Sequence, residues 1–147
     1  MNQTFVMRGQ TASGKTELLE FGGRKPGYGY RLTEFQLFPS VSNVACMLSG
    51  SLTAAKAFED PTNQNFNNEG LIASAIVKND EDSEYGPFLF GVVNDTFLIT
   101  QNLILAVIDN KSGSPIAVNW QCRFESVKLS SSQEAVANYK QFNIFDE

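Results

Sequence analysis

The longest regular pattern in this chain is a strict alternation of apolar and polar side chains from Ile116 to Phe124. The apolar positions are Ile116, Val118, Trp120, Cys122 and Phe124, and the positions between them are Ala117, Asn119, Gln121 and Arg123. A period of two predicts a β-strand with one face in a core and the other in water or at a contact. The pattern therefore predicts a β-sheet protein.

A second apolar segment, Leu103–Ile108, comes shortly before this strand. The residues between them, Asp109–Pro115, are rich in turn formers. We therefore expect these two segments to pair as a long antiparallel hairpin.

Short apolar segments separated by turn residues recur along the whole chain. The expected strands are Phe5–Arg8, Leu18–Phe21, Tyr28–Phe38, Val44–Ala55, Leu71–Val77, Phe88–Val93, Phe97–Thr100, Leu103–Ile108 and Ile116–Leu129. Many short strands without intervening helices predict an all-β fold, an antiparallel, jelly-roll-like β-sandwich. The length of 147 residues predicts a single domain over residues 1–147.

Two local patterns modify this plan. The apolar parity changes within Tyr28–Phe38 and again after Phe124, which predicts a β-bulge or a passage between sheets at each place. Near the C-terminus, Ser131 and Glu134 form a capping box before apolar residues at helical spacing. We expect one short helix over residues 131–142, followed by a tail over residues 143–147.

Composition limits the classes of partner. Sixteen acidic against eleven basic residues give a net charge of −5, which predicts no nucleic-acid partner. No apolar run is long enough to span a bilayer and the first residues do not resemble a signal peptide, so we expect no membrane association and synthesis in a cytoplasm. Charged residues make up only 18%, which predicts that part of the surface contacts protein.

The chain contains no histidine, so triads and zinc sites that depend on imidazole are excluded. The remaining carboxylates with acid–base potential are Glu34, Glu59, Asp60 and Glu125, and sequence alone does not place them opposite one another. We predict no catalytic residue, no cofactor and no enzymatic activity.

One motif points to nucleotide binding. Residues Gly9–Thr16 match GxxxxGK[ST], in which backbone amides cradle phosphates. The helix that should open at Lys15 has no room, because Gly22 and Gly23 follow Thr16 closely. The context favours a polar turn between two strands.

An acidic segment and two cysteines are the other candidates for chemistry. Asp80, Asp82 and Glu84 could converge on a cation such as calcium, but the EF-hand pattern is absent and a solvated loop is favoured. Cys46 and Cys122 are far apart in sequence and each lies in an apolar row. We expect two buried thiols, with a disulfide as the minor alternative.

Aromatic residues suggest two kinds of contact surface. Trp120, Tyr28 and Tyr30 could form a platform for a sugar, although the apolar row around Trp120 favours core packing. The Asn-rich loop Asp60–Asn68 carries a lone aromatic, which suits a docking loop. The candidate subunit contacts are Phe5, Phe66, Phe142, Ile144 and Phe145.

Four stretches are similar to small structural proteins of marine tailed bacteriophages: Arg31–Ser40, Asn67–Ala73, Val93–Gln101 and Val118–Glu125. This resemblance implies a role in the virion, and the short chain lacks the spine helix and arm of a major capsid protein. It implies a capsid cement or decoration protein that binds the major capsid protein or other virion proteins and self-associates, for example as a trimer. The alternative is a carbohydrate- or receptor-binding β-sandwich module.

Overall fold

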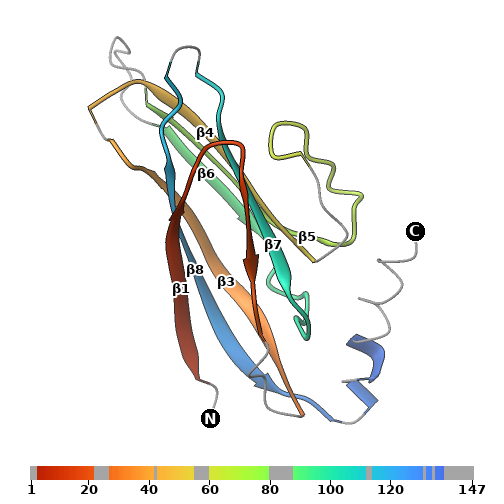
Figure 1. The fold of residues 1–147 in the computed structure, drawn as a ribbon. Helices are drawn as coiled ribbons and strands as arrows, with labels where there is room; N and C mark the ends of the chain where they lie inside the picture. Colours follow the sequence, from red (N-terminus) through yellow and green to blue (C-terminus); the bar gives the residue numbers. More distant parts are fainter. Residues whose placement is uncertain are drawn as a thin grey trace.

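The computed structural model describes residues 3–21, 27–41, 43–54, 60–79, 88–111, 114–130, 132–133 and 135–137. Two antiparallel sheets lie face to face, with their long strands running along the same axis of the molecule (Figure 1). The predicted all-β sandwich is confirmed.

The described residues form eight strands. They are β1 (Thr4–Thr11), β2 (Thr16–Leu19), β3 (Tyr28–Pro39), β4 (Cys46–Ala54), β5 (Leu71–Asn79), β6 (Phe88–Val93), β7 (Leu103–Asp109) and β8 (Val118–Lys128). One sheet has the order β1-β8-β3 and the other β2-β7-β4-β5-β6.

The strand order of the two sheets is that of a jelly roll in which β6 lies in the other sheet. Winding one long eight-stranded hairpin into two Greek keys pairs β1 with β8, β8 with β3, β2 with β7, β7 with β4, and β4 with β5. All these pairs are present, but β6, which would pair with β3 in that winding, pairs with β5 instead. As a result, among the described strands, β3 and β6 each have one edge with no strand paired to it in the same sheet.

The core lies between the sheets and uses the alternation seen in the sequence. Phe124 is fully buried, stacks on Phe5 with ring centroids 5.3 Å apart, and makes an edge-to-face contact with Phe21 at a centroid distance of 5.2 Å. Trp120 is also buried, and its indole N–H donates to the hydroxyl of Thr11 at 3.0 Å. Core packing of Trp120 is therefore confirmed.

The expected hairpin between residues 103–108 and 116–124 is wrong. β7 lies between β2 and β4 in the five-stranded sheet, whereas β8 lies between β1 and β3 in the other. The turn residues that follow Asp109 carry the chain from one layer to the other. Turn chemistry signals a change of direction, and the same residues suit a reversal within a sheet or a crossing between sheets.

The parity change in β3 is a β-bulge, where the register against β8 shifts between Leu32 and Glu34. No register shift interrupts the pairing of β8 after Phe124. The ninth expected strand, residues 97–100, is reduced to a single bridge, in which Tyr30 and Ile99 exchange backbone hydrogen bonds of 2.9 and 2.7 Å.

Helical residues 132–133 and 135–137 follow β8. The capping box lies one residue earlier than expected. The N–H of Gln133 donates to the hydroxyl of Ser130 at 3.2 Å, and the N–H of Ser130 donates to Oε1 of Gln133 at 2.9 Å. Ser131, Glu134 and the segment from residue 138 onward, which includes the expected tail, lie outside the described residues.

Candidate functional site

The most distinctive surface is an apolar patch on strand β6. Phe88, Leu89, Phe90 and Val92 are 51%, 61%, 60% and 53% exposed. An apolar strand at the edge of a sheet normally carries a charge, a proline or a bulge that blocks further pairing. β6 has none of these, so its exposure needs a functional explanation.

The neighbouring strand and loop extend this surface. Ile76 of β5 lies opposite Phe90 in the register and is 44% exposed. The rings of Phe88 and Phe90 contact edge to face, with centroids 4.4 Å apart. Phe66 is 66% exposed and lines a shallow pocket together with Val92. We define the β6 patch as Phe66, Ile76, Phe88, Leu89, Phe90 and Val92. Within it, Leu89 points to the opposite face of the sheet from Phe88 and Phe90, and lines a pocket with residues of β3.

The Asn-rich loop is held against the same sheet. The side-chain amide of Gln64 donates to the carbonyl of Gly50 in β4 at 3.2 Å, and its carbonyl accepts a hydrogen bond from the hydroxyl of Ser74 in β5. Asp60 accepts hydrogen bonds from the N–H and hydroxyl of Thr62 at 2.9 and 2.8 Å, which fixes the first turn. The loop is therefore a packed structure that presents Phe66 beside β6.

The five predicted subunit contacts fall in different places. Phe66 belongs to the β6 patch. Phe5 is half-buried on the inner face of β1, where it stacks on Phe124 and makes an edge-to-face contact with Tyr30. Phe142, Ile144 and Phe145 lie outside the described residues. Sequence reasoning missed the exposure of β6, although its uncharged segment Phe88–Val93 was a recognisable signal for an unprotected edge.

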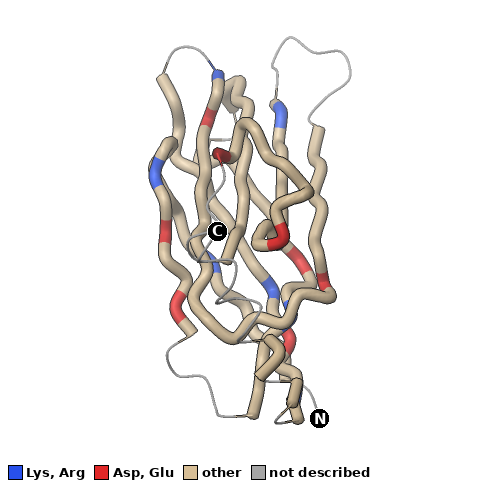
Figure 2. The backbone as a smooth tube through the Cα atoms, turned by 90° about the vertical axis from the view of Figure 1, so that its right-hand side faces the viewer, with Lys and Arg blue, Asp and Glu red and all other residues tan. Residues whose placement is uncertain are grey.

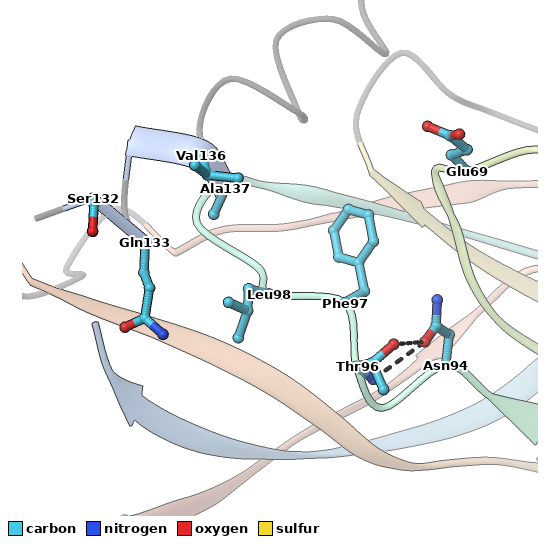
Figure 3. Close-up of a pocket in the computed structure, with 9 residues that line it drawn as sticks. All are labelled: Glu69, Asn94, Thr96, Phe97, Leu98, Ser132, Gln133, Val136 and Ala137. Atoms are coloured by element: carbon cyan, nitrogen blue, oxygen red, sulfur yellow. Dashed lines mark hydrogen bonds between the residues drawn. The ribbon is translucent and has the colours of Figure 1, made fainter. Parts of the chain in front are cut away.

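A separate pocket of about 510 Å³ lies between the connection after β6 and the helical segment (Figure 3). Its walls combine the apolar residues Phe97, Leu98, Val136 and Ala137 with polar residues from the same two segments and from the loop before β5. Among the described lining residues, Glu69 is the only ionisable one, and the polar groups of Asn94 and Thr96 hydrogen-bond to each other in a turn. The described lining therefore does not supply a pair of carboxylates.

The described carboxylates do not converge elsewhere. Glu34 pairs with Arg123 at 3.4 Å on the outer face of the three-stranded sheet. Acidic and basic positions are scattered along the described chain (Figure 2), and the described residues contain no cluster of three or more metal-ligating side chains. Glu59, Asp80, Asp82 and Glu84 lie outside the described residues.

Asp109 is buried and has a structural task. Its Oδ1 accepts hydrogen bonds from the N–H groups of Met47 at 3.1 Å and Lys111 at 3.0 Å, and its Oδ2 accepts one from Ile116 at 3.1 Å. Its own N–H donates to the hydroxyl of Ser13 at 2.8 Å. This carboxylate therefore fastens the crossing between the two sheets to the start of β4.

The Gly9–Thr16 motif forms the end of β1 and the turn into β2, as the polar-turn interpretation predicted. A Cβ atom at Gly9 would lie 2.9 Å from a ring carbon of Trp120, so packing explains this glycine. Gly14 has a φ of 80°, which explains the second glycine. The N–H of Gly14 donates to the carbonyl of Val107 at 2.9 Å, so it does not face a phosphate.

Cys46 and Cys122 are both free and buried, as expected. Burial raises the pKa of the Cys122 thiol to about 12. Burial, and secondarily the carboxylate of Asp109, raises the pKa of Cys46. Since the thiolate is the reactive form, neither residue has the properties of a nucleophile.

This gives a direct chemical prediction. At pH 8, Cys46 and Cys122 of the folded protein should resist alkylation by iodoacetamide for hours. In urea at about 6–8 M, which unfolds the protein, both cysteines should be alkylated completely. Intact mass measured over time checks it. Fast labelling of the native protein at either cysteine would show that the core opens readily or that the thiol is exposed.

A second surface is the outer face of the three-stranded sheet. Phe38 is 61% exposed and lies opposite Asn119 in the register, and Gln36 lies opposite Gln121. The amide of Gln10 donates to Asn119 at 2.9 Å, which orders this face. Tyr28 and Tyr30 are half-buried and Trp120 faces the core, so Phe38 is the exposed aromatic residue of this face.

No protein-family model matches the sequence, and no curated protein matches it either. Arguments about function therefore depend on the surfaces described above. Among the described residues, no helix has the length and apolar character needed to cross a membrane.

Proposed function

We propose that this chain is a non-enzymatic structural protein of a virus particle, a capsid cement or decoration protein. It acts by burying apolar surface against the major capsid protein or other virion proteins and against copies of itself, a trimer being one symmetric arrangement. The similarity of four stretches to structural proteins of marine tailed bacteriophages motivates the virion setting.

The observation that carries the proposal is the β6 patch. Four of six consecutive residues of an edge strand are large, apolar and more than half exposed, which is the pattern of a surface that another protein covers. The sandwich behind it is a rigid support, because β6 hydrogen-bonds to β5 over its whole length. Rigid support lowers the entropy lost on binding.

Such a protein stabilises a shell through linkage. A ligand that binds only the assembled state, at a free concentration one hundred times its Kd, adds about 2.7 kcal/mol per site. No bond is made or broken in this role, which agrees with the scattered carboxylates and inert thiols of the described chain.

The test uses virus particles purified by density gradient from cultures that carry this gene. Quantitative mass spectrometry should find the chain in a fixed ratio to the major capsid protein. Particles made without the chain should release their genome at a temperature several degrees lower. The proposal fails if the chain is absent from purified particles while the other virion proteins are recovered.

Phe38 and its amide neighbours favour one alternative, a carbohydrate- or receptor-binding module. An aromatic face beside convergent amides suits stacking and hydrogen bonding to a sugar. A glycan array separates the two functions: binding that is lost in Phe38→Ala and kept in Phe90→Ala would support the module, and no binding by the wild-type protein would remove it.

A further inference from the structure

We infer that the free edge of β6 pairs in an antiparallel manner with β6 of a second copy of this chain, around a two-fold axis near Phe90. The two five-stranded sheets then become one continuous sheet across a dimer. This deepens the self-association within the proposed function by naming the surface, the partner and the register.

The backbone of β6 is available for this pairing. The N–H of Asn94 donates to the carbonyl of Ile72 at 2.8 Å and continues the β5–β6 register. Antiparallel ladders alternate, so Phe88, Phe90 and Val92 direct their backbone groups to β5. The backbone groups of Leu89, Gly91 and Val93 are consequently directed to the free edge, where no described strand pairs with them.

The first argument that the partner of β6 is a second copy of this chain is the distribution of charge. The chain carries a net charge of −5, so two copies repel each other except through an uncharged surface. Residues Phe88–Val93 contain no charged side chain. A basic partner would leave its charges unpaired against this strand.

The available area also suits a symmetric dimer. At about 200 Å² for a large side chain in full exposure, the exposed fractions of the β6 patch correspond to about 670 Å² per copy. Two copies together would bury at most about 1,300 Å², and this upper limit lies at the lower end of the range for stable interfaces.

Side-chain sizes select the register. With Phe90 opposite Phe90 of the second copy, Leu89 lies opposite Gly91 of the second copy, and Phe88 lies opposite Val92 of the second copy. Leu89 then meets a residue without a side chain, Phe88 meets the smaller Val92, and Phe90 stacks on its own symmetry mate. Backbone hydrogen bonds form between Leu89 and Gly91 of the two copies, which are the residues directed to the edge.

Cysteine cross-linking tests the register on the full chain. In a non-hydrogen-bonded pair the Cα atoms lie about 4.5 Å apart, which a disulfide can span. Phe90→Cys should therefore form a covalent dimer under mild oxidation, seen on a non-reducing gel. Leu18→Cys is the matched control, because Leu18 is 51% exposed on β2 at the opposite edge of the same sheet and should stay monomeric on that gel.

Two results would overturn the inference. One is a covalent dimer of Gly91→Cys without a covalent dimer of Phe90→Cys, because this result would place the two-fold axis at Gly91. The Gly91→Cys variant should fold, since a Cβ at this position would lie 3.5 Å from the carbonyl of Phe35, an ordinary contact. The other is a wild-type protein that sediments as a monomer at concentrations near 100 μM (about the Kd of the weakest specific contacts).

A charge variant gives an independent readout. Phe90→Lys places two ammonium groups against each other at the axis and should raise the dimer Kd by about 100-fold or more. Leu18→Lys should leave the Kd unchanged. Sedimentation equilibrium measures both, and circular dichroism verifies that each variant is folded; an unchanged Kd in Phe90→Lys would contradict the proposed edge.

These results are separable from the test of function. A chain found in purified particles that is monomeric alone would leave the virion role standing and refute the β6 dimer. A chain that forms the Phe90→Cys cross-link but is absent from purified particles would support the β6 dimer and refute the virion role.

Discussion

Replacing Phe124 by alanine is expected to lower the free energy of unfolding by about 3–5 kcal/mol. The ring is fully buried between the sheets and contacts Phe5 and Phe21. Alanine removes these contacts and leaves a cavity that two hydrogen-bonded sheets cannot close. Urea denaturation followed by tryptophan fluorescence measures the change, since Trp120 is the only tryptophan.

The matched control is Phe38→Ala on β3 of the same sheet, where the ring is 61% exposed. This variant should cost less than about 1 kcal/mol. Similar losses in both variants would show that Phe124 is not packed as described.

Replacing Asp109 by alanine is expected to cost about 3 kcal/mol or more, because it leaves three backbone N–H groups without their acceptor. Hydrogen bonds to a charged carboxylate are each stronger than neutral ones. Asp109→Asn should recover part of the loss, since an amide keeps one acceptor oxygen but presents an N–H₂ group to one of the former donors. Denaturation midpoints at pH 7 compare the two variants.

Asp95 provides the control for charge alone. It is exposed on the turn after β6, and Asp95→Ala should change the stability by less than about 0.5 kcal/mol. A loss below about 1 kcal/mol in Asp109→Ala would mean that water replaces the carboxylate at this crossing.

Local patterns in the sequence were sufficient where the determining contacts are local. The alternation in residues 116–124 became β8, and the parity change in β3 became the bulge between Leu32 and Glu34. The capping box was predicted one residue late, because Ser130, Ser131 and Ser132 are equivalent by type and only the geometry selects Ser130. A run of identical residues therefore predicts that a helix begins there but not at which residue it begins.

The Gly9–Thr16 motif shows the opposite limit. Its two glycines satisfy a phosphate-loop pattern, yet one makes room for Trp120 and the other allows a left-handed turn. Glycines in a short motif indicate positions where the backbone needs a positive φ or close contact, and several different loop structures have such positions. The strand context predicted this outcome correctly, because no helix could follow the motif.

The candidate site could be predicted only in part. Phe66 was expected on the surface because it stands alone in a polar loop, and it is exposed. The exposure of β6 was not predicted, because an apolar strand is normally assigned to the core. Its exposure depends on which strands become sheet edges, and that follows from long-range pairing.

The sequence by itself determined the fold class, eight of the nine expected strands and the inward row of β8, because side-chain alternation and turn residues act over a few neighbouring positions. Only the tertiary structure decided that β7 and β8 lie in different sheets and that β6 pairs with β5. These choices depend on contacts between residues far apart in the chain, whose energies no local pattern encodes. The same choices leave β6 at an edge, where its apolar side chains become a surface.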